Sequence, residues 1–189
     1  LTYPEEECKL VKDMNYQDEI DYIVTHEKRN DFIKNLTLSL NNNTLVLFQF
    51  VEKHGSVLYD LIKSNTDRQV FYVYGGTDTQ TREQIREITE KEKDAIIVAS
   101  YGTFSTGINI RNLHNIVFSS PSKSRIRTLQ SIGRGLRRSE SKDSAVLYDI
   151  ADDITYKSKR NFTLNHFMER INIYNEEQFD YEIKRIKLK

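Results

Sequence analysis

The chain has 189 residues, of which 38% are hydrophobic and 30% are charged, and its 28 basic residues balance its 28 acidic residues. This length fits one domain of ordinary size with a core of its own, and the composition is that of a soluble globular protein. No apolar run is long enough to span a membrane, and a single cysteine, Cys8, excludes a disulfide framework within the chain. We therefore expect a protein of a reducing cytoplasm with no membrane partner.

Short apolar runs alternate with helical patterns along the first 150 residues, which is typical of βαβ units around a parallel sheet. The spacing predicts a helix capped by Thr25, a helix after Gly55, and a polar helix with Ile85 and Ile88 facing inward. The predicted strands are 45–48, 70–73, 95–99, 115–118 and 145–150. The fold class that follows is α/β, with a mostly parallel central sheet flanked by helices.

Three regions are predicted along the chain. The acidic run after Pro4 and the absence of an initiator Met indicate that residues 1–18 are a linker from a missing upstream region. Residues 19–151 form the α/β domain. Residues 152–189 form a C-terminal helical extension and a possible edge strand, in which Tyr181 and Ile183 face inward.

The segment 130–138, QSIGRGLRR, carries the strongest chemical signal. If it is helical, Arg134 and Arg137 lie three residues apart and project from the same face. A guanidinium is always charged and its planar fork matches phosphate oxygens, so the pair is suited to a transferring phosphoryl group. The alternative is a basic surface helix whose arginines form ordinary ion pairs.

Polar loops follow two of the predicted strands, at the end of a parallel sheet where ligands gather. Gly75 and Gly76 precede the helix at 79–91 and could turn backbone N–H groups toward a phosphate, or could form an ordinary tight turn. The loop 100–109, SYGTFSTGIN, places hydroxyls and glycines at the next strand end, which suits phosphate and ribose or simply a plain polar loop.

The charge distribution supports a phosphate-contacting face, although the chain as a whole is neutral. Between Arg111 and Lys142 eight residues are basic, and one, Glu140, is acidic. The first 31 residues show the opposite bias, with nine acidic and four basic residues. A solvated helix face would give the same counts.

The order of these segments resembles that of superfamily 2 helicases, and the amino-acid sequence at 98–108 and 130–134 is most similar to the phage UvsW-type branch. The strand at 45–50 resembles motif IV, Gly75-Gly76 to Arg82 motif IVa, Ser100 to Asn109 motif V, and Gln130 to Arg137 motif VI. Two departures stand out. The loop from Ser100 to Gly107 is one residue longer than in many relatives, and Asn109 replaces an Asp.

This resemblance implies the second, RecA-like motor domain of an ATP-dependent DNA helicase that remodels branched DNA and R-loops. It implies that Arg134 and Arg137 act on the γ-phosphate of ATP. It also implies two groups of binding residues: Gly107, Asn109, Gln130 and Gly133 in the nucleotide cleft, and Gly75, Gly76, Arg82 and Ser100 on the phosphates of one DNA strand.

The sequence lacks a G-x-x-x-x-G-K-[ST] loop and an Asp-Glu pair at the end of an apolar strand. We therefore expect ATP and Mg²⁺ to be bound mainly by a first motor domain upstream, and this chain alone to be inactive. The four histidines are scattered, so no zinc site is expected, and they are interpreted as surface or helix-flank residues. The alternatives are a stand-alone nucleic-acid-binding module and part of a restriction-system motor subunit.

Overall fold

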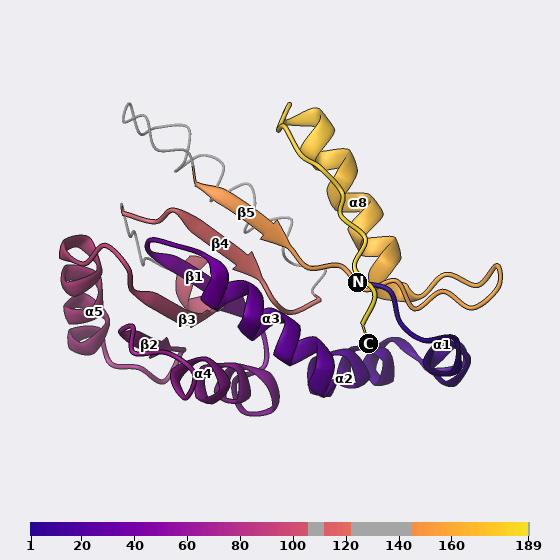
Figure 1. Cartoon of the computed structure of the whole chain (residues 1–189), viewed down its shortest axis with the longest axis horizontal. Helices are drawn as coiled ribbons and strands as arrows, with labels where there is room; N and C mark the ends of the chain where they lie inside the picture. Colours follow the sequence, from indigo (N-terminus) through magenta and orange to yellow (C-terminus); the bar gives the residue numbers. More distant parts are fainter. Residues whose placement is uncertain (106–111, 122–144, 189) are drawn as a thin grey trace.

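The fold is built on a five-stranded, all-parallel sheet. We describe a computed structural model that covers residues 1–105, 112–121 and 145–188. The strands are β1 (Thr44–Phe48), β2 (Val70–Val73), β3 (Ile96–Ser100), β4 (Asn115–Phe118) and β5 (Val146–Asp149), in the spatial order β2-β3-β1-β4-β5 (Figure 1). Each predicted strand is present to within one residue. The predicted fold class, a RecA-like α/β domain, is confirmed.

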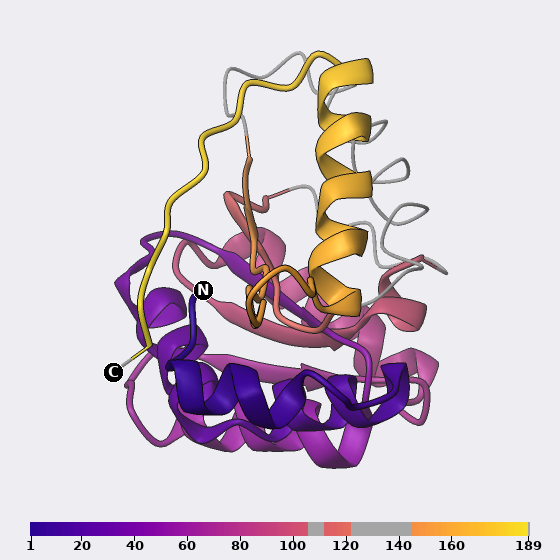
Figure 2. The same ribbon diagram turned by 90° about the vertical axis from the view of Figure 1, so that its right-hand side faces the viewer.

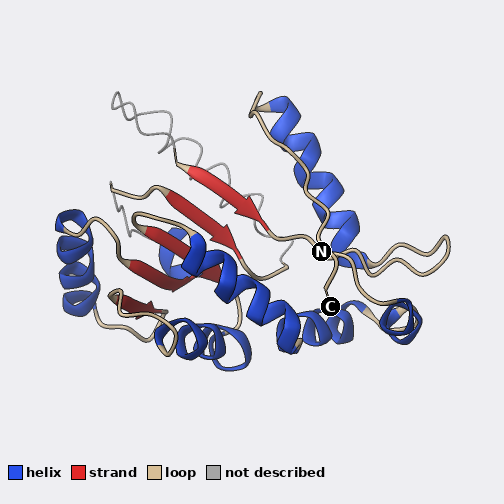
Figure 3. Cartoon of the chain, in the orientation of Figure 1, coloured by secondary structure: helices blue, strands red, loops and turns tan. Residues whose placement is uncertain are grey.

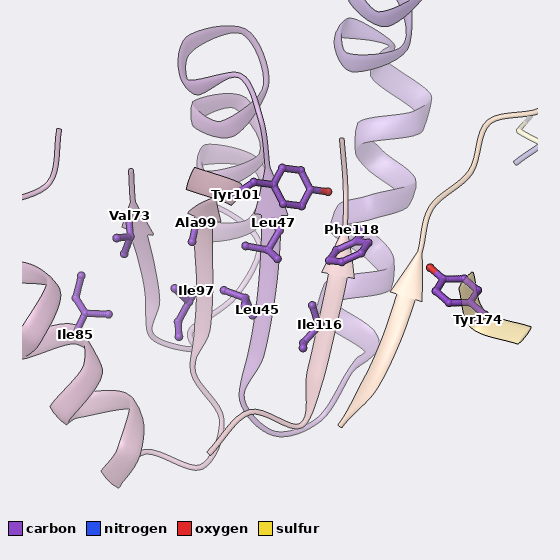
Figure 4. Packing of buried hydrophobic residues seen from close by; sticks show 10 residues of the cluster. All are labelled: Leu45, Leu47, Val73, Ile85, Ile97, Ala99, Tyr101, Ile116, Phe118 and Tyr174. Carbon is purple, nitrogen blue, oxygen red and sulfur yellow. The ribbon is translucent and has the colours of Figure 1, made fainter. Parts of the chain in front are cut away.

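The central strands are apolar on both sides because helices cover both faces of the sheet. One face carries Val46, Phe48, Val98 and Val117, and packs against α3 (Glu27–Ser39) and α4 (Ser56–Lys63). The opposite face carries Leu45, Leu47, Ile97, Ala99, Ile116 and Phe118 (Figure 4). There the cover comes from α5 (Thr79–Lys91), α6 (Tyr101–Ser105) and α8 (Phe162–Glu176), through Ile85, Tyr101 and Tyr174.

Two helices precede the sheet where a linker was expected. They are α1 (Glu5–Val11) and α2 (Tyr16–Thr25). Tyr3, Cys8 and Val11 are buried against Ile23 of α2, so residues 1–18 are packed. The predicted cap was wrong: Thr25 ends α2, and the side chain of His26 instead accepts a hydrogen bond from the Arg29 N–H at the start of α3.

The C-terminal extension is a helix followed by an extended segment. An ion pair docks α8, in which Arg170 donates to both carboxylate oxygens of Asp149 at 2.6 and 2.9 Å. After α8 the chain is a loop (Figure 3) that returns to the N-terminus, where the N–H groups of Thr2 and Leu188 bond to Ile186 and Thr2 carbonyls. The predicted edge strand was wrong: residues 180–188 hold an isolated bridge, and Tyr181 and Ile183 are exposed.

The chain turns sharply after β1. A π-helical turn, η1 (Val51–Gly55), leads directly into α4; such turns are rare and frequently occur at functional sites. Gly55 is required here, because a Cβ at this position would lie 2.4 Å from the ring of Phe48. Among the described helices, none is long and apolar enough to cross a membrane.

Candidate nucleic-acid interface at the carboxyl end of the sheet

All five strands point toward one end of the sheet, which we call the carboxyl end (Figures 1 and 4). β2 and β3 are parallel neighbours, with Val73 opposite Ala99. The residues that follow them, Tyr74-Gly75-Gly76 and Ser100, therefore lie at adjacent strand ends. Sequence reasoning assigned both segments to one site, and the topology places them side by side.

The loop after β2 is a tight turn that starts α5. The Thr77 N–H donates to the Tyr74 carbonyl at 2.9 Å, and Thr77 Oγ1 accepts from the Tyr74 N–H at 3.1 Å. Neither glycine adopts a left-handed φ, so the backbone of this turn does not itself require glycine. The glycines differ in their surroundings. A Cβ at Gly76 would meet the Tyr74 ring at 2.7 Å, whereas the space beside Gly75 is open.

Asp78 caps α5 and orders the helix N-terminus that follows this turn. Its carboxylate accepts from the Thr81 N–H at 2.9 Å and from the Thr81 hydroxyl at 2.6 Å. These hydrogen bonds from Thr81 stabilise the ionised form and hold the pKa of Asp78 below its ordinary value. The helix therefore begins at a fixed point beside the exposed Gly75.

Arg82 reaches from α5 back to this loop. Its Nη2 donates to the carbonyls of Tyr74 and Gly75 at 3.4 and 3.0 Å. Its Nε is buried and has no hydrogen-bond partner among the described residues. The side chain is half-buried. The Arg82 guanidinium lies beside the exposed Gly75. It could turn toward a phosphate at a small cost in free energy, because it would give up one hydrogen bond to each of two backbone carbonyls.

Ser100 ends β3 and begins α6. Its hydroxyl lies 2.7 Å from the Thr103 hydroxyl and accepts from the Thr103 N–H at 3.4 Å, which caps this short helix. Ser100 is buried at the surface boundary, with 9% of its area exposed. Its Oγ therefore serves the helix start, and a phosphate contact at this position would compete with the Thr103 hydroxyl.

Ser120, after β4, joins three strand ends through buried hydrogen bonds. Its Oγ accepts from the Gln49 N–H at 3.0 Å and lies 2.7 Å from His54 Nδ1. Its carbonyl accepts from the Tyr101 hydroxyl at 3.3 Å. Of the two expected positions for His54, surface or helix flank, the structure gives the second: it is completely buried in η1, directly before α4. Nothing in the local sequence pattern shows that η1 turns this histidine inward.

Six of the predicted site residues lie outside the described part of the chain. They are Gly107, Asn109, Gln130, Gly133, Arg134 and Arg137. Four lie within it, at the carboxyl ends of β2 and β3: Gly75, Gly76, Arg82 and Ser100. Within the described residues, no group of three His, Cys, Asp or Glu side chains could hold a metal ion.

Comparison with known proteins identifies this architecture. The model of the helicase conserved C-terminal domain matches residues 27–139, which is more than half of the chain. The chain belongs to the helicase C-terminal domain family. This confirms the resemblance drawn from the order of motifs.

The relatives of this helicase C-terminal domain include a phage enzyme. The chain is 40% identical over its whole length to the ATP-dependent DNA helicase uvsW of Enterobacteria phage T4. The crystal structure of T4 UvsW superimposes with a TM-score of 0.88 over 100% of this chain. The C-terminal part of the Fun30 ATPase domain is 17% identical, with a TM-score of 0.56 over 90% of this chain and 63% of that one, and shows the fold alone. The chain spans 40% of the length of the phage relative.

Proposed function

We propose that this chain is the second motor domain of an ATP-dependent DNA helicase that unwinds branched DNA and R-loops. The observation that carries the proposal is the 40% identity over the entire chain to a phage ATP-dependent DNA helicase. The carboxyl end of the sheet is compatible with it, because the Gly75 turn, the N-terminus of α5 and Ser100 lie at neighbouring strand ends.

In this proposal the carboxyl end has two tasks. Gly75, Gly76, Arg82 and Ser100 hold the phosphates of one DNA strand, while the segment carrying Arg134 and Arg137 faces ATP. The nucleotide is bound mainly, with Mg²⁺, by an upstream motor domain, because this sequence contains no phosphate-binding loop. Gly107, Asn109, Gln130 and Gly133 complete the cleft from this side. Opening and closing of the cleft then moves the grip along DNA.

The arginines provide the first test. If Arg134 and Arg137 stabilise the transition state, each change to Ala in the full-length protein lowers kcat by about 10³–10⁵, with little change in KM for ATP. Arg137→Lys also fails, because an ammonium lacks the planar fork. The measurement is the ATPase rate at saturating DNA, with thermal unfolding as the check on folding.

Arg138 is the matched control, because a residue one step round an expected helix faces elsewhere. Arg138→Ala should retain nearly normal turnover. An inactive Arg138→Ala protein beside active Arg134→Ala and Arg137→Ala proteins would show that the motif is assigned wrongly.

Two other functions give different results in the same preparation. A stand-alone nucleic-acid-binding module binds DNA without hydrolysing ATP, even as the full-length protein. A restriction-system motor hydrolyses ATP but needs further domains. Unwinding assays on forked, four-way and R-loop substrates separate the proposed activity from both.

A further inference from the structure

A short basic hairpin follows β5 and was not anticipated from the sequence. We define the basic hairpin as residues 155–160. Tyr156 and Lys159 exchange two backbone hydrogen bonds, at 3.1 and 3.0 Å, around the two-residue loop Lys157-Ser158. Lys157 has a φ of 53°, which places it in the left-handed region. The four residues from Lys157 to Arg160 are all exposed, and three of them are cations.

The base of the basic hairpin is held rigidly by buried polar side chains. Ile154 is 1% exposed and its N–H donates to Asn161 Oδ1 at 3.0 Å. The Asn161 amide in turn donates to Glu19 Oε1 and to the Asp152 carbonyl, each at 3.0 Å. The residues on both sides of the hairpin are therefore fixed, and the exposed tip extends from them.

A buried ion pair strengthens this base. Arg29 donates from Nε and Nη2 to the two carboxylate oxygens of Asp152, at 2.7 and 2.9 Å. Burial alone would raise the pKa of Asp152, but the Arg29 guanidinium holds it below its ordinary value. Asp152 is thus a charged anchor directly before the hairpin, and its charge is neutralised inside the protein.

The charge at the tip, by contrast, remains on the surface. Lys12 of the loop after α1 and Lys157 each lie 5.5 Å from the centre of the Tyr156 ring. The carboxylate that the structure places beside these cations is Asp13, which lies 3.6 Å from Lys12 and 3.5 Å from Lys159. Lys12 and Lys159 thus share the exposed carboxylate of Asp13, while Lys157 and Arg160 add two further exposed cations to the same hairpin, on a chain with no net charge.

The basic hairpin lies at the carboxyl end of the sheet. It begins six residues after Asp149, the last residue of β5, and projects past α1 (Figure 1). In the view toward this end it faces the reader (Figure 2). β2 and β5 are the two edge strands, so the basic hairpin and the loop after β2 lie at the same end of the sheet but on opposite sides of it.

We propose that the basic hairpin is a second DNA-contacting surface, which binds the phosphate backbone beyond the strand held at the carboxyl ends of β2 and β3. This inference rests on the proposed helicase function. Lysine and arginine side chains on a rigid two-residue turn can contact successive phosphates of a DNA backbone, and such contacts do not depend on base sequence. Lys12, which lies over the Tyr156 ring, and the exposed Ser158 of the two-residue loop belong to the same surface.

The test uses the full-length protein and two fluorescent probes, a single-stranded 30-mer of thymidine and a mixed-sequence blunt duplex. The hairpin variant is Lys157→Asn/Lys159→Gln/Arg160→Gln, in which Asn tolerates the left-handed φ at position 157. We expect it to bind DNA about tenfold more weakly at low salt. The slope of log Kd against log salt should fall by about one for each phosphate that the variant no longer neutralises.

The matched control is Lys63→Gln/Lys91→Gln/Lys93→Gln. It removes the same charge from exposed positions at the end of α4 and around the end of α5, at the opposite end of the sheet. It should bind DNA like the wild type. A charge-preserving variant, Lys159→Arg/Arg160→Lys, should do the same, which separates charge from folding.

The outcomes distinguish this inference from the proposed function. If the wild type binds neither probe, the proposed function fails. If the wild type binds DNA and the hairpin variant matches it in Kd and salt slope, the hairpin inference is overturned while the proposed function stands. An acidic protein partner would give that second result. Equally weakened binding in the hairpin and control variants would also overturn the inference, because net charge alone would then explain the binding.

Discussion

The two ends of the sheet use polar side chains in different ways. At the amino end, the buried Asn43 amide donates to the carbonyls of Thr89, Glu92 and Asn112 at 2.8–3.0 Å and accepts from the Ala95 N–H. Nearby, Arg68 donates to three further carbonyls. These side chains bond to main-chain groups and close the end of the sheet.

At the carboxyl end the polar side chains also bond to one another. Ser100 contacts the Thr103 hydroxyl, and Ser120 contacts His54. Arg82, whose guanidinium reaches the loop after β2, has a buried Nε that lacks a partner in the described part of the chain. A ligand can replace contacts between side chains more easily than it can replace main-chain bonds buried in the core. The contrast is therefore between the amino end, which bonds to main-chain groups, and the ends of β2 and β3, where side chains are available for exchange; at β5 the carboxyl end is fixed by the Arg170–Asp149 ion pair.

Removal of Asn43 should give the largest effect on stability. Asn43→Ala removes the partner of two buried main-chain groups, the Thr89 carbonyl and the Ala95 N–H, and each such loss costs about 1–3 kcal/mol, so we expect a loss of about 3 kcal/mol. Urea unfolding of residues 1–189 measures it. The control is Asn41→Ala, an exposed neighbour expected to change stability by less than about 0.5 kcal/mol. Equal stabilities of the two variants would show that Asn43 does not close this end.

Ser120 should matter less. Ser120→Ala removes the acceptor of the Gln49 N–H and the partner of His54, with an expected cost of about 2 kcal/mol. Ser119→Ala is the control, because the Leu47 carbonyl that accepts from its hydroxyl also accepts from its N–H. We expect the control to lose about half as much in the same unfolding assay. If Ser119→Ala lowers the free energy of unfolding as much as Ser120→Ala does, the hydrogen bonds of Ser120 do not join the strand ends as described.

Arg82 should affect stability least and DNA most. Arg82→Ala gives up two hydrogen bonds to carbonyls, so stability should change by less than about 1 kcal/mol, while DNA affinity falls several-fold at low salt. Arg86, one turn further along α5, pairs with Glu83 and Glu90 and provides the control. If Arg86→Ala weakens DNA binding as much as Arg82→Ala does, the loop after β2 is not the contact.

The sheet could be predicted from the sequence because each buried strand is a continuous apolar run between polar segments. Four of the ten site residues could also be placed at strand ends, since parallel strands bring the segments that follow them to one end. Contacts between distant residues could not be predicted. Arg29 and Asp152 pair across 123 positions, and no local pattern marks either residue.

Local spacing also misplaced several side chains. Ile88 was expected to face inward but is 38% exposed, because the core contact of α5 passes through Ile85. The burial of His54 could not be predicted, because η1 is a π-helical turn with a Gly55 N–H to Phe50 carbonyl bond, and its side chains do not follow α-helical spacing. The basic hairpin could not be predicted because its two-residue loop contains neither glycine nor asparagine, the residues that usually mark such turns.

The contact between Gly55 and Phe48 has a consequence for how this domain can diverge. The missing Cβ of Gly55 and the ring of Phe48 occupy one shared volume, and Phe48 is fixed from its other side by stacking on Tyr72. Position 55 cannot enlarge alone. An alanine at position 55 requires the Phe48 ring to move or a smaller side chain at 48, so we expect the two positions to change together. The same pairing limits redesign, because η1 can be straightened only together with the end of β1.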